Sequence, residues 1–239
     1  MFLVVALASV PFAYDGQLRP GQTLTVRDIN GSVRVRTGDR LSVRATKHAD
    51  HGDPNGVAIH VENRSDGIVV CVRYPPEASR GCDERKFSQS HSDRDNDTLV
   101  DFEITVPHGI TLDAATVNGS VDAMNDGPTE AATVNGSVQV EGRDVRRAAS
   151  VNGSVRVKVL DRGHGTLTAR SVNGSIEVTL APGSGVVLNA HTLTGGISAE
   201  GITVDRPRWG PGAHANGTLG DGAMHVSAET VNGSITLRR

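Results

Sequence analysis

Short runs of alternating apolar and polar residues recur along the chain and meet at a repeated five-residue motif. In the copy Val134-Asn135-Gly136-Ser137-Val138 the apolar residues and the glycine occupy every second position, and the alternation continues to Val140. An extended chain with this pattern places Val134, Val138 and Val140 on one face and the polar residues on the other. The pattern therefore predicts strands whose motif valines, including Val151 and Val172, form an inward column.

The motif recurs too often to be accidental, at intervals of about 20 residues, which is typical of stacked repeat architectures. Two copies are degenerate: Leu193–Ile197 has Thr194 in place of the Asn, and Ala215–Leu219 keeps Asn216-Gly217 but begins with Ala215. The regular copies centre on Asn30 and Gly31, Asn118 and Gly119, Asn135 and Gly136, Asn152 and Gly153, Asn173 and Gly174, and Asn232 and Gly233.

Asn-Gly is also the preferred two-residue turn of a β-hairpin, so the motif has two readings. A hairpin would place Val134 across from Ser137 and would mix apolar and polar side chains on both faces. A continuous, locally bent strand keeps the two kinds of side chain apart, and we therefore favour it. An alanine three residues before each motif fits a tight corner or bulge between it and the valine, and Asn and Gly suit a left-handed backbone there.

Stacking of such units predicts an all-β fold, a β-solenoid or β-helix-like stack of short rungs with little or no helix. Equivalent Asn and Ser side chains would lie about 4.8 Å apart along the stack and form hydrogen-bonded ladders. Each Asn-Gly-Ser is formally an N-glycosylation acceptor, but recurrence at a fixed parity favours a structural role.

Beyond residue 13, two portions of the chain are distinguished by their patterns. Residues 14–110 are rich in alternating strands, with a long polar loop over residues 75–98, and residues 111–239 carry the repeat solenoid. Because one copy of the motif, at Asn30, lies in the first portion, we expect the two to be continuous.

Composition restricts the classes of partner. Aromatic residues make up only 3% of the chain, glycines number 28 and the net charge is −3, which suits thin, regular β layers. The near-neutral charge gives no basic stripe for nucleic acid.

Residues 1–13 are almost entirely apolar and resemble the core and cleavage region of a secretory signal, truncated because no basic residue precedes them. Cleavage would follow Ala8 or Ala13. The run is too short to span a bilayer, and no later segment qualifies. An N-terminal strand is the alternative.

The two cysteines, Cys71 and Cys82, predict one disulfide in an exported chain, with free thiols as the alternative.

Other polar clusters favour plain structural readings, and we expect no metal and no cofactor. Asp93, Asp95 and Asp97 alternate as in a calcium loop but lack the required glycine and glutamate. A turn rich in Gly, Pro and Asn holds His48, Asp50, His51 and Asp53. Trp209, the single tryptophan, lies in a loop and fits a cap or a sugar-stacking residue.

An enzyme is the main alternative function, because β-helices also host polysaccharide-acting enzymes. Those enzymes need two carboxylates at a defined distance, and Asp122, Glu141 and Glu177 occupy unequal places in the repeat. We expect no catalytic residues.

The chain resembles a bacterial family of β-strand-repeat proteins described as putative adhesins, largely of unknown function. The resemblance rests on the recurring motif, the strand end Val70–Pro75, the strand Phe102–Pro107 and the closing Thr230–Leu237. It implies an exported, non-enzymatic scaffold in the periplasm, on the cell surface or secreted. Such a scaffold would bind a protein or glycan partner at the cell envelope, or serve a purely structural or envelope-stress role.

Overall fold

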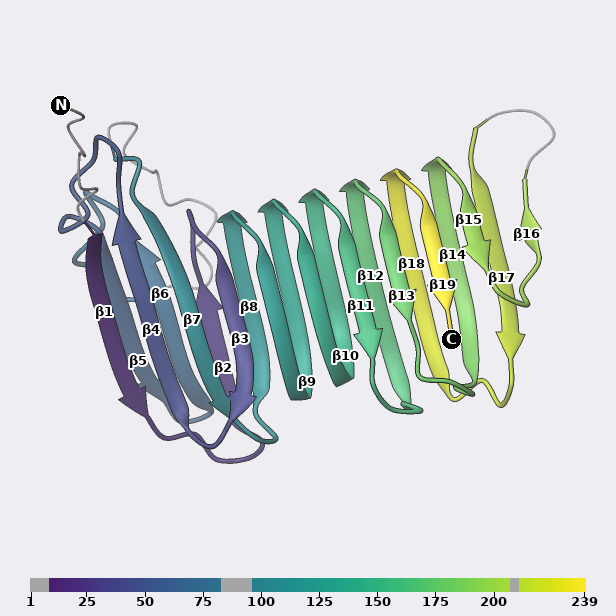
Figure 1. The fold of residues 1–239 in the computed structure, drawn as a ribbon, viewed down its shortest axis with the longest axis horizontal. Coiled ribbons are helices and arrows are strands. Elements are labelled where there is room, and N and C mark those ends of the chain that lie inside the picture. Colours follow the sequence, from purple (N-terminus) through teal and green to yellow (C-terminus); the bar gives the residue numbers. More distant parts are fainter. Residues whose placement is uncertain (1–8, 83–95, 207–210) are drawn as a thin grey trace, which may run out of the picture.

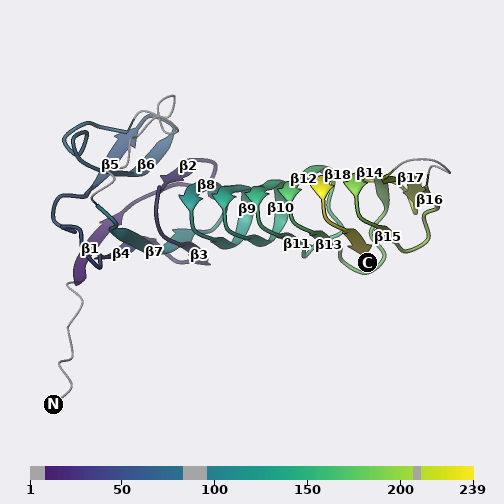
Figure 2. The ribbon, with the colours of Figure 1, turned by 90° about the horizontal axis from the view of Figure 1, so that it is seen from above.

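The computed structural model describes residues 9–82, 96–206 and 211–239, and these residues form β-strands and connections without any helix. All 19 strands belong to one continuous hydrogen-bonded sheet. Figure 1 shows the strands side by side along the long axis, and Figure 2 shows that the sheet folds into two facing layers.

The strands are β1 (Ser9–Gly16), β2 (Thr23–Arg27), β3 (Val33–Gly38), β4 (Leu41–His48), β5 (Ala58–Arg64), β6 (Gly67–Arg73), β7 (Leu99–Pro107), β8 (Thr111–Asn118), β9 (Val121–Asn135), β10 (Val138–Asn152), β11 (Val155–Val159), β12 (Gly165–Asn173), β13 (Ile176–Thr179), β14 (Val186–Thr194), β15 (Ile197–Ala199), β16 (Val204–Asp205), β17 (Ala213–Leu219), β18 (Met224–Asn232) and β19 (Ile235–Arg238).

Each Asn-Gly-Ser motif is the corner at which the chain passes from one layer to the other. We call the layer whose strands lead into the motif the entry layer, and the layer whose strands follow it the exit layer. The entry layer runs β5, β6, β2, β8, the second half of β9, the second half of β10, β12, β18, β14, β17 and β16. The exit layer runs β1, β4, β7, β3, the first halves of β9 and β10, β11, β13, β19 and β15.

Most neighbours within each layer are parallel and in register, so equivalent repeat positions pair with each other. Asn118 pairs with Asn135, and Asn152 pairs with Asn173. Antiparallel strands occur only towards the two ends of the layers, among β1, β4, β5, β6 and β7 and among β14, β16 and β17, as far as the structure describes the chain.

The order of rungs in space differs from the order in sequence. The C-terminal pair β18–β19 lies between β12–β13 and β14–β15, as the yellow strands in Figure 1 show. Thr194 therefore pairs with Asn232, and the degenerate copy at Thr194 is the outer neighbour of the last regular copy. The spacing of the motifs along the sequence does not reveal this order.

The second degenerate copy is not a corner. Asn216 lies inside β17, which pairs antiparallel with β14, opposite Asn189. This strand ends the parallel series and lies against the last rung, so the Asn-Gly dipeptide at 216–217 has no stacking partner of its own kind.

One core fills the space between the layers from Leu18 to Leu237, and its residues come from both sides of residue 110. Strands β2 and β3 pair directly with β8 and β9, so hydrogen bonding is continuous across this position. The rung outside β2 and β3 consists of β6 and β7, and no Asn-Gly-Ser motif lies between these two strands in the sequence.

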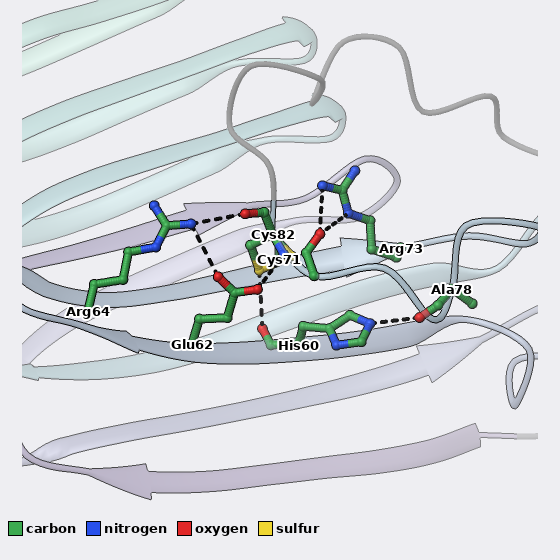
Figure 3. Close-up of a disulfide and its surroundings, with 8 residues drawn as sticks. His60, Glu62, Arg64, Cys71, Arg73, Ala78 and Cys82 are labelled. Atoms are coloured by element: carbon green, nitrogen blue, oxygen red, sulfur yellow. Dashed lines mark hydrogen bonds and ion pairs between the residues drawn. A yellow bond between two sulfur atoms is a disulfide. The ribbon is translucent and has the colours of Figure 1, made fainter.

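Strand β6 is buried on both faces because residues 74–82 fold back over its outer side. Cys71 and Cys82 form a disulfide that holds this segment, as shown in Figure 3. The Cys82 backbone N–H donates to Glu62 Oε1 at 2.6 Å and holds the pKa of that carboxyl below its usual value. Arg64 donates to the Cys82 carbonyl at 2.9 Å, and the Arg73 guanidinium donates to the Gly81 carbonyl.

Candidate binding surface

The exposed corner carries a ladder of asparagine side chains. Each side-chain amide donates to the side-chain oxygen of the next asparagine at 2.7–2.9 Å, in the series Asn232, Asn173, Asn152, Asn135, Asn118 and Asn30. Serine hydroxyls pair in two places, Ser120 with Ser137 and Ser175 with Ser234. The nitrogen that glycosylation would modify is thus engaged in holding the rungs together.

The motif glycine is required by close approach of the neighbouring rung. A Cβ built on Gly136 would lie 2.1 Å from the carbonyl oxygen of Gly119, and one on Gly153 would lie 1.9 Å from that of Gly136. Asparagine does not supply a left-handed backbone, since no non-glycine residue of the described chain has a positive φ. The expected reason for Asn at this position is therefore wrong.

Inside the corner, hydroxyl groups form a second column that the sequence analysis missed. Thr133 Oγ1 donates to the Gly119 carbonyl and Ser150 Oγ to the Gly136 carbonyl, both at 2.8 Å. The same bond recurs from Thr116, Ser171, Thr192 and Thr230. A Thr or Ser two residues before the Asn, in every regular copy except that of Asn30, was the visible signal. Each of these glycine carbonyls thus gains a side-chain partner.

The first motif valine faces outward, so the predicted inward column of Val134, Val151 and Val172 is wrong. These side chains are 38–40% exposed, whereas Val138 and Val140 are buried as predicted. The corner at Asn-Gly-Ser interrupts the alternation, and no corner lies between the preceding alanine and the valine. Ala131 and Thr133 are the inward residues instead.

The outward valines form an apolar ridge along the outer face of the entry layer. In spatial order the ridge consists of Val134, Val151, Val172, Val231 and Leu193, each 38–46% exposed. Val117 precedes it and is partly buried. Neighbouring strands lie about 4.8 Å apart, so the ridge is a continuous apolar strip.

A groove of about 460 Å³ runs beside the ridge in its second half. Val172, Val231 and Leu193 line one side, and Arg170, Glu229 and His191 line the other. Arg170 Nε lies 3.2 Å from Glu229 Oε2. Ala115, Ala132 and Ala149 hold the equivalent positions on the earlier rungs, so the apolar strip is wider there by one row, and the next outward row carries Asp113, Glu130 and Arg147.

The outer face of the exit layer is charged by contrast. Asp122, Glu141 and Glu177 all lie there, and each is paired with a cation: Asp122 with Arg36, Glu141 with Lys158, and Glu177 with Arg156 and Arg238. The structure thus does not bring these three carboxylates into one cleft as a hydrolytic pair.

The remaining candidates from the sequence are engaged elsewhere or lie outside the described residues. His48 contacts Asp101 at 3.4 Å, His51 contacts Asp97 at 3.4 Å, and Asp53 accepts from Asn55. Asp93, Asp95 and Trp209 lie outside the described residues. Within the described ranges no three His, Cys, Asp or Glu side chains are gathered to hold a metal ion.

One buried carboxyl stands at the end of the inward hydroxyl column. Asp28 takes the place of Thr or Ser on the rung of Asn30, and burial raises its pKa to about 8. Its Oδ2 accepts from the Thr116 hydroxyl at 3.3 Å, while Oδ1 has no hydrogen-bond partner among the described residues. Tyr74 is buried nearby and donates to the Thr98 carbonyl at 2.6 Å.

No described segment is a helix of the length and hydrophobicity needed to cross a membrane. No family model matches the chain, and no curated protein is similar to it in sequence.

The fold has a counterpart among solved structures. A putative cell adhesion protein from Clostridium sporogenes superposes with a TM-score of 0.52 and 14% identity, covering 96% of this chain and 99% of that one. A putative adhesin from Bacteroides fragilis covers 95% of this chain and 97% of its own, at 8% identity and a TM-score of 0.28. The first likeness is one of fold, and the second is too distant to indicate more.

Proposed function

We propose that this chain is an exported, non-enzymatic β-solenoid scaffold that binds a protein partner through the apolar ridge of the entry layer. The ridge supports this proposal most directly: five large apolar side chains, Val134, Val151, Val172, Val231 and Leu193, are held in line and exposed. Contiguous exposed apolar strips mark interaction sites in soluble proteins.

A ridge is a costly feature that the fold does not need. The corner requires Asn and Gly, and the layer requires the inward Ala and Thr or Ser, but an outward position in a strand accepts polar residues. The exit layer shows this, since its equivalent outward positions carry Arg, Asp, Glu and Lys. The contrast between the two faces favours a binding role for one of them.

The chemistry of the ridge favours a protein over a glycan. Its members are aliphatic, and the described part of the entry layer places no aromatic ring beside them on which a sugar would stack. A protein partner with its own apolar strip would bury this surface from water and gain about 25 cal/mol per Å² of apolar area removed.

The likeness of fold to the putative cell adhesion protein from Clostridium sporogenes supports a scaffold role in which the surface binds. The disulfide supports an extracytoplasmic location, because such bonds persist in oxidising compartments.

This proposal is tested with fluorescent beads that are coated with this protein. Their binding to whole cells and to isolated envelopes is measured. We expect the combined variant V134S/V151S/V172S to lose the binding shown by the wild type, and protease treatment of the cells to abolish it. A matched control, Gln139→Ser with Arg156→Ser, changes the exit layer and should bind as the wild type does. Binding that survives the ridge variant would refute the ridge as the site, and binding removed by glycosidase but not by protease would assign a glycan.

A further inference from the structure

A row of polar side chains crosses the last five strands of the entry layer. Arg170 on β12 is in register with Glu229 on β18, which is in register with His191 on β14. His191 stands directly opposite His214 on the antiparallel strand β17, and His214 stands opposite Asp205 on β16.

The two histidines share the outer face of the layer. Their inward neighbours in the same strand pair, Ala190, Ala215, Thr192 and Ala213, are all buried, and both histidines are exposed. Directly opposed residues in an antiparallel pair have Cβ atoms about 4.5–5.5 Å apart. The two imidazoles are therefore held side by side by backbone register and not by chance rotamers.

Neither ring is committed to another role. No described residue hydrogen-bonds to the His191 ring, although His191 lines the groove beside the ridge. The Nε2 of His214 lies 3.8 Å from Asp205 Oδ2, an approach looser than a hydrogen bond. The nearest carboxylate to His191 in register is Glu229, which pairs with Arg170 at 3.2 Å.

We propose that His191 and His214 bind a divalent transition-metal ion of the zinc class, with one ring nitrogen from each. Tetrahedral zinc takes nitrogen ligands at about 2.0–2.1 Å, which places two such nitrogens about 3.4 Å apart. Opposed cross-strand histidines reach that separation by rotation of exposed side chains, which takes place in picoseconds to nanoseconds.

Asp205 completes the arrangement as a positioning residue. A metal-bound histidine commonly donates its other ring N–H to a carboxylate, which fixes the orientation of the ring. Asp205 is placed for this role beside His214, on the side away from His191. With two protein ligands, the remaining coordination positions are left to water or to ligands from a partner.

This site does not depend on the proposed partner, so its test uses the protein alone. Zn²⁺ is titrated calorimetrically into tag-free full-length protein and into the single variants His191→Ala and His214→Ala. Asp205→Asn removes a supporting residue and should weaken Zn²⁺ binding about 10–100-fold. Loss of either histidine ligand should weaken it by more than that. His225→Ala is the matched control, because His225 is an exposed histidine on β18 whose neighbours in register are Thr166 and Val187.

Wild-type stoichiometry of one Zn²⁺, with loss in both ligand variants and retention in the His225 variant, supports the site. Equal affinity in wild type and the H191A/H214A double variant would overturn it, as would the absence of binding by the wild type. Thermal unfolding of each variant without metal checks that these exposed substitutions leave the fold intact. None of these outcomes alters the interpretation of the bead-binding experiment.

Discussion

At the scale of single residues, each position of the motif is explained by the close approach of neighbouring rungs at the corner. Rungs lie so close at the corner that only glycine fits, the inward Thr or Ser provides a donor for the glycine carbonyl, and the outward Asn bonds to its equivalents. The valine between the inward hydroxyl and the Asn faces outward and stays partly exposed, and it is the residue through which we propose that a partner binds.

Replacement of Gly136 by alanine should destabilise the stack strongly. The new Cβ would lie 2.1 Å from the Gly119 carbonyl oxygen, so two rungs must separate to accommodate it. Overpacking of this kind costs about 1–3 kcal/mol, and thermal unfolding should show a lower Tm. Gly196→Ala is the control, because a Cβ there has nothing within 4 Å. Equal Tm values for the two variants would contradict the close-approach explanation.

Asp28 makes stability depend on pH. Its folded pKa of about 8 lies above the unfolded value of about 3.9, so the folded state holds the proton more tightly. The protonated Asp28 carboxyl thus contributes to the free energy of unfolding. This contribution is fully present below the unfolded pKa and is lost as the pH rises through the folded pKa, at up to about 1.4 kcal/mol per pH unit.

We expect Asp28→Asn to remove this loss, because an amide does not ionise. Urea unfolding at about pH 5 and about pH 8 should show a smaller decrease in the free energy of unfolding for the variant than for the wild type. The same decrease in both proteins would mean that Asp28 is not protonated in the folded state.

At the scale of elements, the sequence predicted the strands and their class well, and the corner less well. Alternation identified the strand pattern around Val138 and Val140 because these positions follow the corner and keep one phase. The alternation gave the wrong face for Val134 because it assumes one unbroken strand. At each Asn-Gly-Ser the chain turns into the other layer, so the positions that face inward before the corner are not those predicted from the positions after it. The ridge was therefore assigned to the core.

The N-terminal strand bears on where a signal would be cleaved. Residues Ser9–Ala13 lie in β1, which pairs with β4 along its whole length, and Phe12 and Tyr14 pack against the core. Cleavage after Ala13 would remove most of this strand, whereas cleavage after Ala8 would leave it whole.

If the protein is exported as proposed, we expect its mature N-terminus to be Ser9. Measurement of the intact mass of the exported protein checks this. The variant Ala8→Leu should block cleavage at this site. A mass that corresponds to a chain beginning at Tyr14 would show that β1 is not part of the mature fold.

At the scale of the whole molecule, the order of the rungs was beyond sequence reasoning. The corners of Asn173, Asn232 and Thr194 present the same backbone donors and acceptors, so any of them can stack on another. The structure places β18–β19 as the inner neighbour, and the local motif does not distinguish this order from a sequential one. The degenerate copy at Thr194 lies outermost, beside β17, where it has one regular neighbour instead of two.

Removal of residues 222–239 should uncouple the far end of the stack, because β14 and β15 contact the rest of the parallel series through β18 and β19. Limited proteolysis of the truncated protein should cut within residues 186–205 while residues 111–179 stay protected. Removal of Arg239 alone is the control. Protection of β14 and β15 in the truncated protein would show that they dock on β12 and β13 without the C-terminal rung.

The position of β18–β19 also sets the order of events when the chain is made. Because synthesis starts at the N-terminus, β18 and β19 are made after β14 to β17. Until then, the place of β18 and β19 between β12–β13 and β14–β15 is empty. The far end of the stack can thus close only after residues 224–238 have been made. A product that ends before them would leave the facing edges of β12 and β14 unpaired, and unpaired strand edges promote aggregation.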